Sequence, residues 1–410
     1  MRTLNDVAEP YVRLVLAMGL HDADYVDAYY GPPQWRADAD AARRPLGAID
    51  ADASALLQSL AAVQPGADAD SLVRLRHGYL TRQLEAMRAR VGMLQGNRLT
   101  FDRESQALYD AVAPHADESS FERTIDELGA RLPGTGSVLE RLDAFRHQFI
   151  IPRDRLDATF QAAIAAGRQR TLEHIRLPSG ECFTVEYVTD KSWSGYNWYQ
   201  GEYRSLIQVN TDLPIFVDRA IDLACHEGYP GHHVYNALLE SRLVRDRGWV
   251  EFSVYALFSP QSLIAEGTAN FGIDVAFPRD ERIEIERGVI FPAAGLDGAR
   301  AVEYDEVLAL VDRLSYAGNE AARRYIDGDI DRDTAAEWLE RYALYSPARA
   351  RQRVRFIEQY RSYVINYNLG KDMVRRYIEG CGGTPADPVR RWTLFEELLS
   401  SPRLPSSLVT

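Results

Sequence analysis

The chain has 410 residues, of which 46% are hydrophobic and 26% are charged, and its formal net charge is -13. This length and composition are typical of a soluble globular protein with a sizeable core, organised as one large domain or as two that share a core. The negative charge disfavours nucleic acid and anionic membrane as partners.

The cellular setting is predicted from the cysteines and from the first residues. The chain has 3 cysteines and no C-x-x-C pair, so we expect no disulfide framework. The start of the chain lacks a basic stretch followed by an apolar run, which is the pattern of a secretory signal. We therefore expect a cytoplasmic protein, whose oligomeric state the sequence leaves open.

The first part of the chain, residues 1–175, is predicted to be a helical N-terminal region. Tyr11, Leu14, Val15 and Met18 recur at the spacing of one helix face. We see no internal repeat and no low-complexity segment. The expected fold class is therefore mainly α.

Residues 176–400 are predicted to form the catalytic region, which shares its core with the N-terminal region. Two segments have strand character, Cys182–Val188 and Arg204–Asn210, and the Trp-, Tyr- and Gly-rich stretch Lys191–Tyr203 between them is expected to be a loop. The second segment could offer its backbone to an extended peptide, as an edge strand does, with Asn210 adding a side-chain contact to the substrate.

A metal site is predicted where histidines cluster. Three of the 8 histidines lie within the segment His226-Glu227-Gly228-Tyr229-Pro230-Gly231-His232-His233. In zinc peptidases with the motif H-E-x-x-H, two histidines one helical turn apart bind the metal, and the Glu is the general base. Here four residues separate Glu227 from the next histidine.

The longer spacing requires a break in the helix. In an unbroken helix, His232 would lie on a different face from His226, and His233 would lie roughly 10 Å further along the axis. The pair Pro230-Gly231 can interrupt the helix and let two residues bulge out. We favour His232 as the second ligand, with His233 as the alternative.

The third ligand is expected from a later helix. Glu266 lies in an otherwise uncharged stretch, where a buried carboxylate is costly unless it is paired or bound to a metal. Asn270 and Asp274 follow at one-turn intervals and could support the ligand histidines by hydrogen bonds. The predicted cofactor is Zn²⁺, although another divalent metal stays open.

These motifs carry a resemblance to a known family. His226-Glu227-x-x-Pro230-Gly231-His232-His233, followed by Glu266-Gly267, resembles the bacterial family called domain of unknown function 885. Asn366-Tyr367-Asn368-Leu369-Gly370 resembles the Ser-Tyr-x-x-Gly element of that family. The family is similar to Glu-zincin zinc peptidases, such as the neurolysin-like enzymes and carboxypeptidase Taq. The resemblance implies a large helical fold with a deep cleft, where a small sheet lies beside the metal helices.

The predicted activity is zinc-dependent hydrolysis of amide bonds in short peptides, of the carboxypeptidase or dipeptidase type. Glu227 is the expected general base, and the phenol of Tyr367 is expected to stabilise the oxyanion. Five arginines precede Tyr367, and one of them could hold a substrate carboxylate; they are Arg349, Arg351, Arg353, Arg355 and Arg361. The alternatives are a zinc hydrolase of a non-peptide amide or modified amino acid, and a non-catalytic metal-binding protein.

Overall fold

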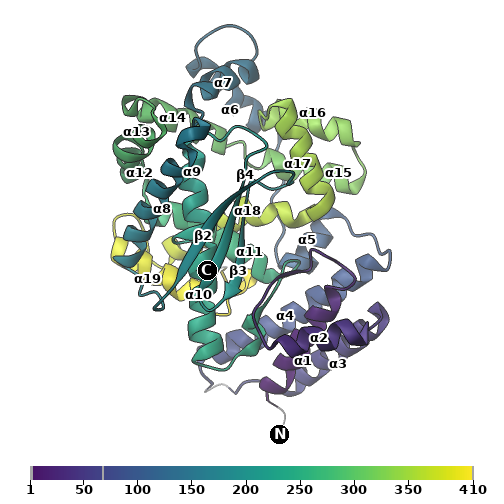
Figure 1. The fold of residues 1–410 in the computed structure, drawn as a ribbon. Coiled ribbons are helices and arrows are strands. Elements are labelled where there is room, and N and C mark those ends of the chain that lie inside the picture. Colours follow the sequence, from purple (N-terminus) through teal and green to yellow (C-terminus); the bar gives the residue numbers. More distant parts are fainter. Residues whose placement is uncertain (1–2, 67–68, 409–410) are drawn as a thin grey trace.

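The computed structural model describes residues 3–66 and 69–408, and these form a mainly helical protein with two small sheets (Figure 1). The fold class predicted from the sequence is confirmed. Of the helices in the described residues, none is long and apolar enough to cross a bilayer.

The N-terminal region is helical except for one short strand. Its elements are α1 (Asn5–Met18), β1 (Val26–Tyr29), α2 (Pro33–Ala42), α3 (Leu46–Ala62), α4 (Ser71–Leu94), α5 (Phe101–Tyr109), α6 (Glu118–Arg131), α7 (Val138–Arg146), η1 (His147–Phe149), η2 (Arg153–Arg155) and α8 (Leu156–Leu172). The residues predicted to share one face of α1 are all buried. Strand β1 was not expected; it pairs in antiparallel orientation with β5 (Val254–Ala256), far along the chain.

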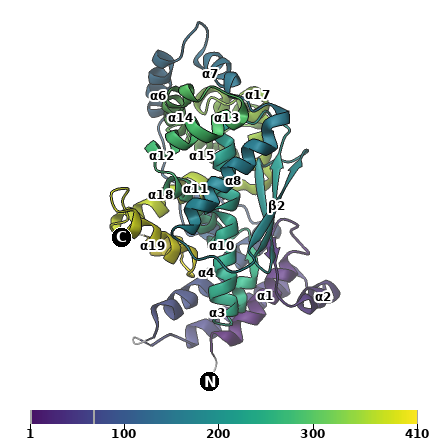
Figure 2. The same cartoon turned by 60° about the vertical axis from the view of Figure 1, so that its left-hand side comes forward.

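The N-terminal region does not lie apart from the rest of the chain. Helices α1–α3 lie at one end of the molecule and α6 and α7 at the other, with later elements between them (Figures 1 and 2). One hydrophobic core cluster contains buried side chains from both predicted regions, among them Val15 of α1 and Leu263 of α11 (Pro260–Ala276). The two ends are therefore joined through a common core.

The three-stranded sheet consists of β2 (Cys182–Val188), β3 (Gly195–Gly201) and β4 (Arg204–Asn210), in the order β2-β4-β3. The bounds predicted for β2 and β4 are confirmed. Two other expectations are wrong. The expected loop contains β3, and β4 is the central strand, parallel to β2 and antiparallel to β3. The backbone of β4 is thus paired on both sides and cannot serve as an edge for a peptide.

The remaining elements are almost entirely helical. They are α9 (Val217–Leu223), η3 (Ala224–Gly228), α10 (His232–Leu239), η4 (Glu240–Arg245), η5 (Val250–Ser253), α11 (Pro260–Ala276), α12 (Arg279–Ile285), η6 (Glu286–Ile290), α13 (Phe291–Ala294), η7 (Gly298–Arg300), α14 (Ala301–Asp312), α15 (Ala317–Asp327), α16 (Arg332–Tyr342), α17 (Pro347–Tyr360), η8 (Arg361–Val364), α18 (Ile365–Gly380), α19 (Pro388–Leu399) and η9 (Pro405–Leu408).

Helices α11 and α18 cross at very short range. A Cβ atom on Gly267 of α11 would lie 2.6 Å from the carbonyl carbon of Gly370 in α18, so only glycine fits there. Helix α11 is buried over nearly its whole length, which explains its uncharged sequence around Glu266. The close crossing brings Glu266 next to tyrosines of η8 and of the start of α18.

Candidate metal centre

The predicted break in the histidine helix is present. Helix α9 continues into a π-helical turn, η3, which carries His226 and ends at Gly228, and a new helix begins at His232. The amide N–H of Gly231 donates to the carbonyl oxygen of Cys225 at 2.9 Å. A Cβ atom on Gly231 would overlap the carbonyl oxygen of His226, so this turn requires glycine.

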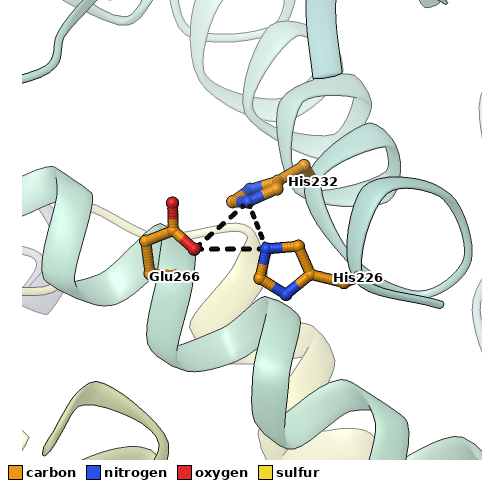
Figure 3. A group of neighbouring side chains, drawn as sticks. All are labelled: His226, His232 and Glu266. Atoms are coloured by element: carbon orange, nitrogen blue, oxygen red, sulfur yellow. Dashed lines mark hydrogen bonds and ion pairs between the residues drawn. The ribbon is translucent and has the colours of Figure 1, made fainter. Parts of the chain in front are cut away.

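The break brings two imidazoles and one carboxylate together (Figure 3). Nε2 of His226 lies 3.2 Å from Nε2 of His232 and 3.2 Å from Oε2 of Glu266. Nε2 of His232 lies 3.6 Å from the same oxygen. These three residues form a group that could hold a metal ion.

The spacing of the three atoms fits a small tetrahedral cation. Zinc bonds of about 2.0–2.1 Å in tetrahedral geometry separate neighbouring ligand atoms by about 3.3 Å. Oε2 of Glu266 is buried and has no hydrogen-bond partner, as expected for an oxygen that serves a metal. Two imidazoles and one carboxylate also leave a coordination position free, which is typical of catalytic rather than structural zinc sites.

The electrostatics of the group show why a cation suits it. Burial lowers the pKa of His232, but the neighbouring Glu266 carboxylate outweighs burial and raises this pKa to about 9. Burial raises the pKa of Glu266, but His232 and His226 outweigh burial and lower it strongly. The carboxylate is thus held charged beside the two rings, and a bound metal would take the place of the proton on His232.

The structure places His233 outside the metal group. Its side chain is fully buried, with Nδ1 at 2.9 Å from Oγ of Ser205 and Nε2 at 3.0 Å from Oε2 of Glu181. Tyr229 donates to the same oxygen of Glu181 at 2.5 Å. This network anchors both sides of the turn that precedes α10, so the geometry favours His232 over His233 as the ligand.

Glu227, the predicted general base, faces the cleft beside the metal group. Its Oε1 lies 4.0 Å from Nε2 of His226. Burial raises the pKa of Glu227. Two residues of β3 lie against Glu227. Asn197 donates to its carbonyl oxygen at 2.7 Å. Gly195 leaves room for its carboxylate, since a Cβ there would lie 2.7 Å from Oε1. Strand β3, which the sequence analysis missed, therefore forms the wall next to the base.

Two tyrosines one helical turn apart lie beside the group. Tyr367, predicted from the sequence, stacks on His226 with 6.4 Å between the ring centres and lines the cleft. Burial raises its pKa well above the usual value, so its hydroxyl stays protonated. Tyr363 was not predicted; it donates to Oε1 of Glu266 at 2.7 Å. The (i, i+4) spacing of the two tyrosines was the signal that could have identified it.

The two expected supports of the ligand histidines have other contacts. Asn270 donates to the backbone carbonyls of Glu266 at 3.0 Å and Tyr367 at 3.4 Å. Asp274 forms ion pairs with Lys371 at 3.0 Å and Arg375 at 3.4 Å. In the described structure neither side chain forms a hydrogen bond with a ligand histidine, because both reach across to α18. Both residues instead tie the two helices together.

Asn210 also differs from its predicted role. Its side chain is buried and donates to the carbonyl oxygens of Lys191 at 3.0 Å and Trp193 at 2.9 Å. It also accepts from the amide N–H of Asp212 at 3.0 Å. With its amide used in this way, Asn210 shapes the loop before β3 and does not line the cleft.

The metal group opens into a large cleft of about 1420 Å³. Besides the residues described above, its walls include charged side chains that the site prediction missed, notably Asp27 of β1 and Arg219 of α9. Asp27 accepts a hydrogen bond from Tyr196 of β3 at 3.0 Å. Asp27 was missed because β1 lies roughly 200 positions before the histidines and no local pattern links them.

Comparisons with known proteins add only the fold. No family model matches the chain, and no curated protein matches it either, so the family resemblance stays a prediction. Among solved structures, a lipoprotein candidate from Colwellia psychrerythraea matches with a TM-score of 0.51 and 14% identity, covering 100% of this chain and 75% of that one. A structure called CHT matches with a TM-score of 0.48 and 11% identity, covering 97% of this chain and 91% of that one. At such low identity, the first match supports a shared fold and nothing further.

Proposed function

We propose that this chain is a zinc-dependent metallopeptidase that hydrolyses amide bonds of short peptides and is of the carboxypeptidase or dipeptidase type. One observation carries the proposal: a buried carboxylate, Glu227, stands beside a group of two histidines and one glutamate whose spacing fits zinc, and all of them face one cleft. A purely structural zinc site needs no free base and usually has four protein ligands.

The residues have distinct roles in this proposal. Zinc held by His226, His232 and Glu266 would supply the positive charge that polarises a carbonyl group and activates water. Glu227 would accept the proton of the attacking water and pass it to the leaving amine. Its raised pKa makes it a stronger base than an ordinary carboxylate. Tyr367, kept protonated, would donate to the oxygen on which negative charge develops.

The test is a cleavage assay of the zinc-loaded protein on a library of short peptides, with products identified by mass spectrometry. We expect cleavage by the wild type and a loss of at least about 100-fold in the Glu227→Gln variant, with unchanged zinc content. Wild-type activity in that variant would contradict the assignment of the base. A zinc-loaded protein that cleaves no peptide would instead favour a non-peptide amide as substrate.

We also propose that the protein is cytoplasmic, as its sequence predicts. The three cysteines are free in the structure: Cys182, Cys225 and Cys381. This supports a reducing environment.

A further inference from the structure

A group of arginines lines the cleft on one side of the metal group. Arg349 and Arg353 come from α17, and Arg146 and Arg219 come from α7 and α9. Four guanidinium groups that gather in one cleft repel one another and require anions to balance them.

Only two of these cations have a carboxylate partner. Arg146 lies 3.6 Å from Asp218, and Arg219 lies 3.5 Å from Asp222. Within the described part of the chain, no carboxylate lies within ion-pair distance of Arg349 or Arg353, the two arginines of α17. The basic side of the cleft therefore carries a positive charge that the described residues do not neutralise.

The surroundings of this pair show the effect of the charge. Arg353 lies over the rings of Phe356 and Tyr367, and its Nε is buried without a hydrogen-bond partner. Burial raises the pKa of Tyr345, but Arg349 and Arg353 outweigh burial and lower it. A donor that is held over aromatic rings and lacks an acceptor is suited to an anion that enters the cleft.

The opposite side of the cleft is acidic. Asp24 and Asp27 line it, and they have no ion-pair partner in the described structure. Two parts of the chain link the two sides. Ser194, which immediately precedes β3, accepts from Arg219, and Tyr196 of β3 donates to Asp27. Helix α17 carries Arg353 and, seven residues on, Tyr360 beside the two aspartates. The positive charge of the arginines would orient the anionic end of a substrate toward α17.

The distance to the metal group is short. Cζ of Arg353 lies 5.8 Å from the centre of the Tyr367 ring, which lies 6.4 Å from the ring of His226. An extended peptide advances by about 3.5 Å per residue. A carboxylate held at Arg353 would therefore follow the cleaved bond by no more than about three residues.

We propose that Arg349 and Arg353 form the subsite for the free α-carboxylate of a short peptide, so that the chain cleaves peptides close to their C-terminus. The inference rests on the proposed function, because it places this subsite relative to the bond that is cleaved. Arg351 lies on the same helix but is exposed to solvent, and it provides a matched control.

The test measures binding to the zinc-loaded Glu227→Gln protein by calorimetry. The probes are N-acetylated tripeptides with a free C-terminal carboxylate and the same peptides as C-terminal amides, so that the amino end contributes no charge. We expect the free acids to bind at least 10-fold more tightly than the amides. This preference should be lost when Arg353→Met or Arg349→Met is added, and kept with Arg351→Met. Zinc content and circular dichroism verify that each variant is folded.

Equal binding of acids and amides, no binding of either, or a preference that persists without Arg349 and Arg353 would overturn the inference. Cleavage of the same peptides by the wild-type protein is measured separately. Cleavage without a carboxylate preference would disprove the subsite and leave the proposed function intact. A carboxylate preference in binding without any cleavage would disprove the peptidase and leave the subsite intact.

Discussion

The two carboxylate oxygens of Glu266 have different surroundings, and this difference explains how one side chain can be both fixed and free to bind a metal. Oε1 accepts a hydrogen bond from Tyr363, which sets the orientation of the carboxylate. Oε2 faces the two histidines and has no hydrogen-bond partner. Hydrogen bonds of this kind to ligand residues commonly determine how tightly a metal is held.

Removal of the Tyr363 hydroxyl tests this role. We expect Tyr363→Phe to weaken zinc binding by roughly 10–100-fold, because the carboxylate loses the donor that orients it. The measurement is a competition titration against a zinc-binding dye. Tyr377→Phe is the control, since Tyr377 lies on the following helix, α18, and its ring packs against Arg403. An unchanged zinc affinity in Tyr363→Phe would show that the ring alone positions Glu266.

At the scale of single elements, the turn between η3 and α10 determines whether the two histidines meet. Only glycine fits at Gly231, because the carbonyl oxygens of Cys225 and His226 occupy the space of a side chain. The position of His232 relative to His226 is therefore set by the backbone of this turn, and not by the regular helical spacing of an H-E-x-x-H motif.

We expect Gly231→Ala to abolish zinc binding and to destabilise the protein by about 2–4 kcal/mol, because the turn must open to admit a methyl group. Denaturant unfolding and zinc titration measure the two effects. Gly47→Ala is the control: Gly47 lies near the start of α3, where a Cβ meets no atom within 4 Å, and its substitution should be tolerated. Normal zinc binding by the Gly231→Ala protein would refute the proposed role of the turn.

The elements also show what could be predicted from the sequence. The helix break at Pro230-Gly231 and the ligands on either side of it follow from local helical geometry, which a short segment specifies. Strand β3 was predicted as a loop because its Asn and Gly residues are typical of loops, although Trp and Tyr favour strands. Its pairing with β4 is what makes it a strand. Asn270 and Asp274 were assigned to the histidines because they share a face of α11 with Glu266. The sequence does not show that α18 packs against that face.

At the scale of the whole molecule, the N-terminal region packs against the helix that carries Glu266. Arg76 of α4 forms a buried two-point ion pair with Glu251 of η5, with Nη2 at 3.0 Å from Oε2. Nearby, Tyr79 donates to Gln261 at the start of α11 at 2.7 Å. Helix α4 thus contacts the helix that carries Glu266. This packing explains why the two predicted regions share one core.

We expect Arg76→Met to reduce the free energy of unfolding by about 3–5 kcal/mol, because it leaves the buried Glu251 carboxylate without its partner. Arg88→Met is the control: Arg88 lies on the same helix and pairs with Asp50 at 2.7 Å, but both are exposed, so the loss should stay below about 1 kcal/mol. Urea unfolding followed by circular dichroism measures both. Equal effects of the two substitutions would show that the buried pair contributes no more than a surface pair.

The zinc content of the purified protein tests the central claim most directly. After dialysis against metal-free buffer, elemental analysis should find about one zinc per chain in the wild type and in His115→Ala, whose imidazole is exposed. It should find almost none in His232→Ala, provided that this variant is folded by circular dichroism. A wild type without zinc after incubation with the metal, or a His232→Ala variant that retains a full equivalent, would contradict the account.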